Sequence, residues 1–317
     1  MKKRIYVALI MLAVLAGAFA FRFIPDYGNY VFDMLVGVLA IFCSMEISKI
    51  LSGMNFISSS MAAGIYPSLM FAGHVISFLF ELKIYFWIAI QVGILLLTSL
   101  AVFVIFVSLN NKYVKDLRKK TNLSRCKLAW KITLGSFISF VYPCFMFSFF
   151  MLLGRFDELK YHTIDKFDGL LSWLVLLSAV LVPIVTDTSA MLFGRLLKGP
   201  KLCEKISPKK TISGAVSAVL LSAVVMGAVY LLFNLDGVYN YGFNYSGIKI
   251  WHFMLFGILC SLISQVGDLF ESFLKRKAGV KDSGNIFPGH GGFLDRLDSH
   301  LFSAPFTFIF FFLLLII

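Results

Sequence analysis

Residues 249–271, KIWHFMLFGILCSLISQVGDLFE, decide the fold class of this chain. The stretch is apolar and long enough to cross the roughly 30 Å hydrocarbon core of a bilayer as a helix. Similar runs recur along the chain. They are far longer than the about ten residues of a membrane β-strand, and they do not alternate between polar and apolar residues. The sequence therefore predicts an all-α, polytopic integral membrane protein.

The composition agrees with this class. Hydrophobic residues make up 59% of the 317 residues and charged residues only 15%, whereas a soluble domain has about 25% charged residues. The net charge of +12 does not indicate nucleic-acid binding, because Lys and Arg accumulate in the cytoplasmic loops of membrane proteins. The five cysteines form no CxxC pair, so neither a zinc site nor a redox motif is predicted.

The apolar runs predict about nine transmembrane helices. Their expected ranges are 5–24, 30–52, 60–80, 84–109, 129–153, 169–192, 211–234, 249–271 and 302–317.

The distribution of positive charge predicts the orientation of these helices. With the N-terminus in the cytoplasm, only six of the 29 Lys and Arg residues fall outside: Arg22, Lys83, Arg155, Lys160, Lys166 and Lys249. The opposite orientation would reverse this bias. The segments 194–210 and 272–300 then face the cytoplasm. The most basic loop, 110–131, is expected to fix the topology and to attract anionic lipid head groups.

The segment after the opening stretch is unusually polar. Residues 272–300 read SFLKRKAGVKDSGNIFPGHGGFLDRLDSH. They combine a basic cluster, a glycine-rich turn at 288–292 and two acids, Asp295 and Asp298, whose spacing lets both carboxylates project from one helical turn. Oxygen ligands of this kind, together with phosphate, suit Mg²⁺. With Asp268 just upstream, the segment predicts a phosphate-handling site at the membrane surface; the alternative for Asp268 is a salt-bridge cluster at a helix end.

Acids inside membrane spans are costly and usually functional. Asp33 lies near the end of a predicted span and is expected to reach water. Glu46 lies deep in the second span, with Lys49 three residues further on. Two roles remain open for Glu46: an intrahelical ion pair with Lys49, or support of the site.

A second polar segment lies on the same predicted side. Residues 186–214 read TDTSAMLFGRLLKGPKLCEKISPKKTISG. In its SPKKT run, Ser207 and Thr211 flank Lys209 and Lys210 at the start of a predicted span. A helix N-terminus with lysines nearby is an anion site. The alternative is that the lysines serve only the topology.

Both segments resemble the phosphatidate cytidylyltransferases, also called CDP-diacylglycerol synthases. The family pattern S-x-x-K-R-x4-K-D, followed by P-G-H-G-G-x-x-D-R-x-D, is matched by Ser272, Lys275, Arg276, Lys281, Asp282, Pro288, Gly289, His290, Gly291, Gly292, Asp295, Arg296 and Asp298. The run Gln265, Gly267, Asp268 is similar to the family's Q-x-G-D. In the second segment, Met191 stands where the family often has Tyr, and Ser213 where it usually has Glu. The resemblance covers about residues 180–300.

The resemblance implies the reaction of CTP with phosphatidate to give CDP-diacylglycerol and pyrophosphate. It implies Mg²⁺ held by Asp268 and Asp295, with Asp298 as a further ligand or behind them; a second cation is left open. The implied catalytic residues are Lys275, Arg276, Lys281, Asp282, His290 and Arg296. The implied substrate-binding residues are Asp187, Arg195, Ser207, Lys209, Lys210 and Ser272.

The chain is expected to divide into N-terminal helices, 1–170, and a catalytic membrane region, 171–317. We expect a bacterial plasma membrane, with the site facing the cytoplasm and membrane lipids as partners; a homodimer is left open. Two other functions are weighed. One is a CTP-dependent lipid kinase acting on a polyprenol. The other is a transporter or scaffold, for which polar residues near mid-span would be expected.

Overall fold

The computed structural model describes residues 17, 28–54, 56, 60–108, 112–158, 170–233, 248–287 and 291–316. The expected span 5–24 lies outside these residues apart from residue 17. The chain forms two compact units, Met1–Lys166 with Leu274–Arg296, and Phe167–Phe273 with Leu297–Ile317. The predicted division into 1–170 and 171–317 stays a prediction.

The described residues contain seven helices that are long and apolar enough to cross a membrane: Gly28–Gly53, Ile84–Ser108, Arg125–Gly154, Leu171–Leu197, Ile212–Phe233, Ile250–Lys277 and Leu294–Leu314. The predicted all-α, polytopic membrane class is therefore confirmed. The third expected span has a shorter apolar helix, Ala63–Leu79. The total of nine spans and the orientation stay predictions.

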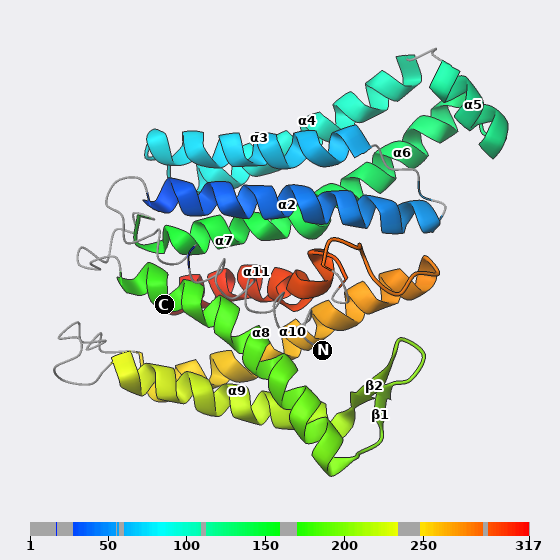
Figure 1. Ribbon diagram of the computed structural model, residues 1–317. Helices are drawn as coiled ribbons and strands as arrows, with labels where there is room; N and C mark the ends of the chain where they lie inside the picture. Colours follow the sequence, from blue (N-terminus) through cyan, green and yellow to red (C-terminus); the bar gives the residue numbers. More distant parts are fainter. Residues whose placement is uncertain are drawn as a thin grey trace. The chain divides into compact units, whose positions relative to one another are not determined.

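The first unit is a helical bundle (Figure 1). Its elements are α2 (Gly28–Gly53), α3 (Ser60–Leu79), α4 (Ile84–Ser108), α5 (Lys112–Thr121), α6 (Arg125–Ser139), the π-helical turn η1 (Phe140–Phe145), α7 (Met146–Gly154) and the 3-10 turn η2 (Phe156–Glu158). Helix α2 packs on α3 and α7, while α4 packs on α3 and α6. The span of α6 and α7 bends at η1, where Tyr142 has non-helical backbone angles before Pro143, as expected of a proline inside a helix.

Apolar side chains of the first unit lie both inside the bundle and on its surface. Ala40, Cys43 and Ile47 of α2 are fully buried. On α4, in contrast, Leu96 and Leu97 are 60% and 67% exposed. An apolar surface of this kind is stable against lipid hydrocarbon rather than water, so α4 has the character of a lipid-facing helix.

Asp33 corrects one prediction. It was expected to reach water, but it is fully buried. Arg155 Nε donates to Asp33 Oδ2 over 2.8 Å, and His74 Nε2 lies 3.3 Å from the same oxygen. Trp87 Nε1 in turn donates to His74 Nδ1. The carboxylate is therefore retained in the bundle by an ion pair rather than by solvent, because a buried charge requires a partner.

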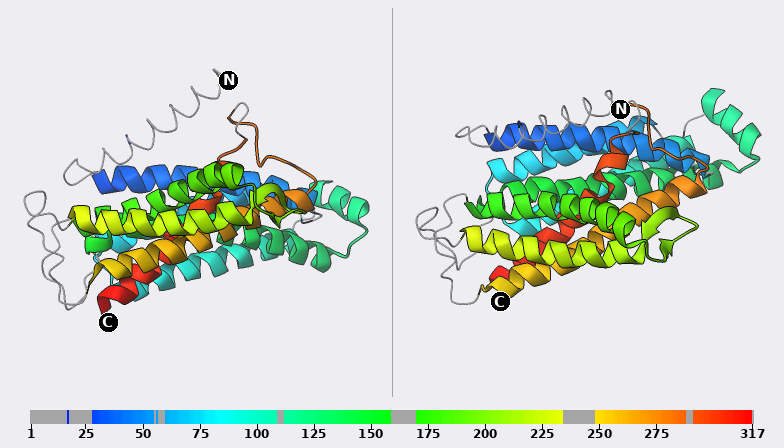
Figure 2. Two further views of the ribbon diagram at one scale, coloured as in Figure 1. Left: turned by 90° about the horizontal axis from the view of Figure 1, so that it is seen from below. Right: turned by 60° about the horizontal axis from the view of Figure 1, so that its bottom comes forward.

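The second unit contains α8 (Leu170–Leu197), the strands β1 (Lys201–Cys203) and β2 (Ser207–Thr211), α9 (Ile212–Phe233), α10 (Ile250–Lys277) and α11 (Leu294–Ile316). The last residues of α10, from Leu274, and the first residues of α11, up to Arg296, belong to the first unit. Helix α8 packs on α9, and α9 and α10 run side by side (Figure 2). Three buried hydroxyls join these helices. Thr186 Oγ1 of α8 bonds to Ser261 of α10 over 2.9 Å and to Ser222 of α9 over 3.2 Å.

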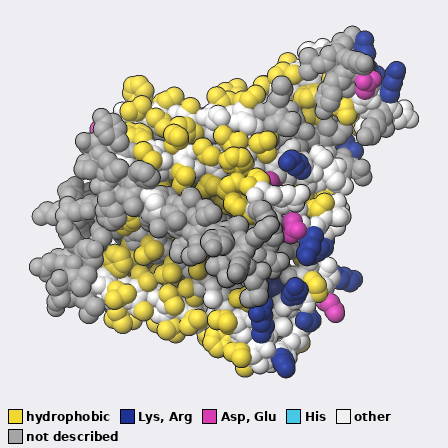
Figure 3. All heavy atoms as spheres, viewed as in Figure 1, with side chains coloured by type: hydrophobic (Ala, Val, Ile, Leu, Met, Phe, Trp, Pro, Cys, Tyr) yellow, Lys and Arg dark blue, Asp and Glu magenta, His cyan; other side chains and the backbone are white. Residues whose placement is uncertain are grey.

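The SPKKT run differs from its expected conformation. It forms β2, which pairs antiparallel with β1, and α9 begins only after it. Thr211 caps this helix, since its hydroxyl accepts the N–H of Gly214; such caps satisfy N–H groups that lack a partner within the helix. In Figure 3, Lys and Arg side chains of the second unit gather around the hairpin, and apolar side chains cover α9.

Candidate functional site

The second unit has a cavity of about 840 Å³ between the hairpin and the ends of its helices. Small-molecule sites commonly measure about 300–1,000 Å³. Five cations line it: Arg195, Lys198, Lys201, Lys209 and Lys210. Two acids, Asp187 and Asp268, line it as well. This cavity, called the hairpin cavity below, therefore suits a polyanion held by cations with carboxylates close by.

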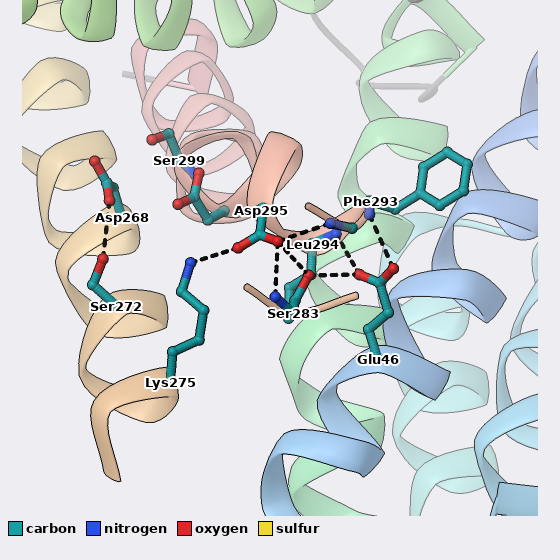
Figure 4. Close-up of polar contacts among 11 residues, drawn as sticks. Glu46, Asp268, Ser272, Lys275, Ser283, Phe293, Leu294, Asp295 and Ser299 are labelled. Carbon is teal, nitrogen blue, oxygen red and sulfur yellow. Dashed lines mark hydrogen bonds and ion pairs between the residues drawn. The ribbon is translucent and has the colours of Figure 1, made fainter. Parts of the chain in front are cut away.

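The hairpin cavity brings together five of the residues expected to bind substrate or metal: Asp187, Arg195, Lys209, Lys210 and Asp268. Lys210 forms an ion pair with Asp268, and Ser272 donates to Asp268 Oδ1 over 3.5 Å (Figure 4). Ser207, on β2, is not among the described residues that line the cavity.

Several carboxylates surround Asp298 in the second unit. Asp298 is 8% exposed and accepts the N–H of Ser299 over 2.6 Å. Asp187, Asp268 and Glu271 lie close enough to interact electrostatically with its carboxyl group. Helices α8, α10 and α11 thus contribute acids to one place, where their mutual repulsion favours a bound cation.

The donor set fits a divalent cation of the Mg²⁺ type. Mg²⁺ prefers oxygen ligands and is usually held by one or two carboxylates plus substrate phosphates. Asp268 and Asp298 offer such oxygens within one unit. Among the described residues, no group of three His, Cys, Asp or Glu side chains is arranged to hold a metal without further ligands. A cation here would therefore take part of its coordination from phosphate oxygens.

In the first unit, Asp295 accepts hydrogen bonds from several donors. Its Oδ1 is paired with Lys275 over 2.5 Å. Its Oδ2 accepts the N–H groups of Ser283 and Gly292, each over 2.8 Å, and the hydroxyl of Ser283 over 2.9 Å. Figure 4 shows this carboxylate between Lys275 and Ser283. In this arrangement Asp295 ties the lysine of α10 to the segment that leads into α11.

Glu46 of α2 joins the same segment. Its carboxylate accepts the N–H of Phe293 over 3.1 Å, the N–H of Leu294 over 2.9 Å and the hydroxyl of Ser283 over 2.8 Å (Figure 4). Of the two roles left open by the sequence, these contacts support the second, in which Glu46 supports the site.

Two glycines of the glycine-rich turn, Gly291 and Gly292, lie close to acidic side chains. Gly291 has φ +82°, in the left-handed region that favours glycine, and the N–H of Phe287 donates to its carbonyl over 2.9 Å. A Cβ on Gly291 would collide with Asp295, and one on Gly292 would collide with Glu46. His290 lies outside the described residues. Arg276, Lys281, Asp282 and Arg296 are exposed around this turn.

Some residues of these clusters were not singled out from the sequence. Lys198 and Lys201 line the hairpin cavity, and in the sequence they contributed only to the count of cytoplasmic charge. Ser283 bonds to both Glu46 and Asp295, but a lone serine in a polar segment gives no signal. Gln265, which was noted only as part of a motif, lines the cavity too.

Comparison with known proteins shows where the likeness lies. Residues 2–314 match the model of a family described as the "Cytidylyltransferase family". Three curated relatives carry the name phosphatidate cytidylyltransferase. The one from Staphylococcus haemolyticus is 46% identical over 130 residues, 41% of this chain and 46% of the relative. The relative from Rickettsia felis is 46% identical over 136 residues, which are 43% of this chain and 57% of the relative. The relative from Rickettsia conorii is 44% identical over 137 residues, which are 43% of this chain and 57% of the relative. The chain spans about half the length of these relatives.

Proposed function

Because the chain belongs to the cytidylyltransferase family, we propose that it is a phosphatidate cytidylyltransferase, which converts CTP and phosphatidate to CDP-diacylglycerol and pyrophosphate. Family membership confirms the resemblance predicted from the sequence and favours an enzyme over a transporter or scaffold. The curated relatives bear the name of this activity. The observation that carries the proposal is the hairpin cavity, where five cations and two carboxylates line a space at the end of membrane helices.

The reaction needs little acid–base chemistry. A phosphate oxygen of phosphatidate, already anionic, attacks the α-phosphorus of CTP. The new P–O bond forms as the bond to the β-phosphate oxygen breaks, and pyrophosphate leaves with that electron pair. The enzyme has to bring two polyanions together and stabilise the charge that moves onto the leaving group, and it does so by positioning and by cations.

The residues divide between the substrates by their place in the chain. The cations of the hairpin cavity, including Lys209 and Lys210, bind the phosphates of CTP. The phosphate of phosphatidate is bound by cations at the end of α10 and around the start of α11: Lys275, Arg276, Lys281 and Arg296. Asp187, Arg195, Ser207 and Ser272 support the nucleotide, and Asp282 and His290 remain catalytic candidates.

Asp268 and Asp298 would hold Mg²⁺, and Asp295 remains a predicted ligand. When bound, Mg²⁺ would offset the negative charge of the substrate phosphates. In the second unit, Lys210 is paired with Asp268, and the two side chains together place a cation and a carboxylate at the wall of the cavity.

The membrane setting supports the same reaction. Phosphatidate is a membrane lipid, and CTP is found in the cytoplasm. We place the N-terminus and both polar segments on the cytoplasmic side of a bacterial plasma membrane, because that orientation leaves only six of 29 Lys and Arg residues outside. A homodimer stays a prediction.

Product analysis tests the proposed function. Membranes that contain the protein, supplied with CTP, phosphatidate and Mg²⁺, should form CDP-diacylglycerol and release one pyrophosphate per turnover. A CTP-dependent lipid kinase would instead release CDP and form a phosphorylated lipid. CDP as the product, or no turnover above that of membranes lacking the protein, would contradict the proposal.

Replacing Lys209 tests the hairpin cavity as the nucleotide site. We expect Lys209→Ala to raise KM for CTP about tenfold, because a hydrogen bond to a charged group contributes about 1.5–3 kcal/mol. KM for phosphatidate should stay within about twofold, since an unrelated site loses no interaction. Lys205→Ala is the matched control, because Lys205 is an exposed lysine of the same hairpin that does not line the cavity. Equal effects of both variants would show that only the hairpin's overall charge matters.

A further inference from the structure

We propose that Glu46, a residue of the second helix, positions residues 283–287 and 291–294 and thereby the phosphate-binding Lys275 for catalysis. The proposal rests on the proposed function and extends it, because it gives the N-terminal helices a part in the transfer reaction. Glu46 touches neither the hairpin cavity nor a cation among its described contacts, so it acts through other residues. It is a positioning residue rather than a catalytic one.

The Glu46 carboxylate is buried and hydrogen-bonded. Glu46 is 2% exposed, in a helix that is long and apolar enough to span a membrane. A buried carboxylate is retained only where donors replace water. Its partners are the hydroxyl of Ser283 and the N–H groups of Phe293 and Leu294. The burial of this charge therefore depends on these donors keeping their present positions.

Glu46 also caps the start of α11. The first N–H groups of a helix have no partner within it and are usually capped by a local side-chain oxygen. Helix α11 begins at Leu294, and the preceding residue, Phe293, has no side-chain oxygen. Glu46 accepts the N–H groups of both residues. The cap thus comes from 248 residues earlier in the chain, and its negative charge also matches the positive end of the helix dipole.

Hydrogen bonds through Ser283 and Asp295 connect Glu46 to Lys275. The Ser283 hydroxyl lies 2.8 Å from Glu46 and 2.9 Å from Asp295. Its single proton serves one of these acceptors at a time, and the N–H of Ser283 is fixed on Asp295 as well. The other oxygen of Asp295 holds the Lys275 ammonium group. Glu46, Ser283, Asp295 and Lys275 therefore form one continuous series of contacts, and a displaced turn displaces the ammonium group.

Two glycines, Gly284 and Gly292, lie directly beside the Glu46 carboxylate. A Cβ added to Gly284 or Gly292 would collide with the Glu46 carboxylate. A side chain at either position would therefore force the Glu46 carboxylate to move from its hydrogen-bonded place. The backbone at Gly284 and Gly292 thus packs directly against the Glu46 carboxylate.

The variant Glu46→Gln tests the proposal. Glutamine keeps the size of the side chain but replaces one acceptor oxygen by an NH₂ group, which faces donors. We expect KM for phosphatidate to rise about tenfold, the loss typical of one charge-assisted hydrogen bond. KM for CTP should stay within about twofold, because the hairpin cavity belongs to the other unit. Glu46→Asp, which keeps the charge, should recover part of the loss. Unchanged KM values, with kcat reduced only in proportion to the folded fraction, would overturn the proposal.

Asp33→Asn is the matched control, because Asp33 is another buried acid of α2. It lies about 20 Å from Glu46 along the helix, and its partners are His74 and Arg155. It should lower the melting temperature and leave both KM values unchanged. An equal rise of the phosphatidate KM in this variant would show that general damage to α2 explains the effect.

Hydrogen exchange separates this proposal from the proposed function. In Glu46→Gln, the amides of Ser283, Gly292, Phe293 and Leu294 should exchange at least about tenfold faster than in the wild type, because an amide without its hydrogen bond opens more readily. Asp33→Asn should not change them. If the wild type forms no CDP-diacylglycerol, the proposed function fails. Unchanged exchange at these amides in Glu46→Gln overturns the positioning role, whatever the reaction is.

Discussion

Replacing Asp295 with Asn should reduce kcat by about two to three orders of magnitude, the loss typical when a preorganised charge-stabilising group is removed. The Asp295 carboxylate accepts hydrogen bonds from the Lys275 ammonium group, two backbone N–H groups and one hydroxyl. An asparagine offers one acceptor oxygen, and its NH₂ group would face donors on the other side. The variant loses the ion pair with Lys275 and the closure of the turn together.

A Mg²⁺ titration of Asp295→Asn distinguishes the two roles proposed for this residue. If Asp295 binds the metal, the Mg²⁺ concentration for half-maximal activity rises, and excess Mg²⁺ restores part of the turnover. If it only closes the turn, the loss is independent of Mg²⁺. Asp116→Asn, an exposed acid of α5, is the control and should keep wild-type turnover. Near-normal activity of Asp295→Asn would contradict both roles.

Replacing Asp268 with Asn should have an even larger effect, with kcat falling by about three orders of magnitude, or about 4 kcal/mol of transition-state stabilisation. Asp268 lines the hairpin cavity, pairs with Lys210 and interacts electrostatically with Asp298. If Asp268 holds Mg²⁺ as proposed, its neutralisation removes a charged oxygen ligand. It also leaves the Lys210 ammonium group without this ion-pair partner.

The two consequences of Asp268→Asn are measured separately. Direct Mg²⁺ binding to the purified protein with CTP present should weaken, while the melting temperature should change by no more than a few degrees, because Asp268 is only partly buried. Glu204→Gln, an exposed acid on the hairpin, is the control for a simple change of charge. Mg²⁺ affinity and turnover at wild-type levels in Asp268→Asn would show that this residue does not serve the metal.

The sequence predicts the helices well because the requirement for apolar length is local. Spans such as Ile84–Ser108 and Ile212–Phe233 lie within about one residue of the expected ranges, 84–109 and 211–234. The motif residues could be found in the same way, since their order and spacing are visible in the chain. Asp187, Lys209, Lys210 and Asp268 were assigned from the sequence before the hairpin cavity was seen to join them.

The remaining features depend on contacts that no local pattern encodes. SPKKT forms a strand because it pairs with Lys201–Cys203, although its position before an apolar run suggested the start of a helix. Asp33 was placed in water because its partner Arg155 lies 122 residues away. Glu46 could not be assigned one role, because its donors lie some 240 residues further along the chain.

The cap on α11 also has a consequence for the biosynthesis of the protein. Ser283 follows Glu46 by 237 residues, so at a translation rate of about 5–20 residues per second the ribosome needs roughly 10–50 s to reach it. During this interval the second helix carries a carboxylate whose final donors have not yet been made. The N–H groups of Phe293 and Leu294 are made later still. The Glu46 cap on α11 therefore forms long after the second helix has been made.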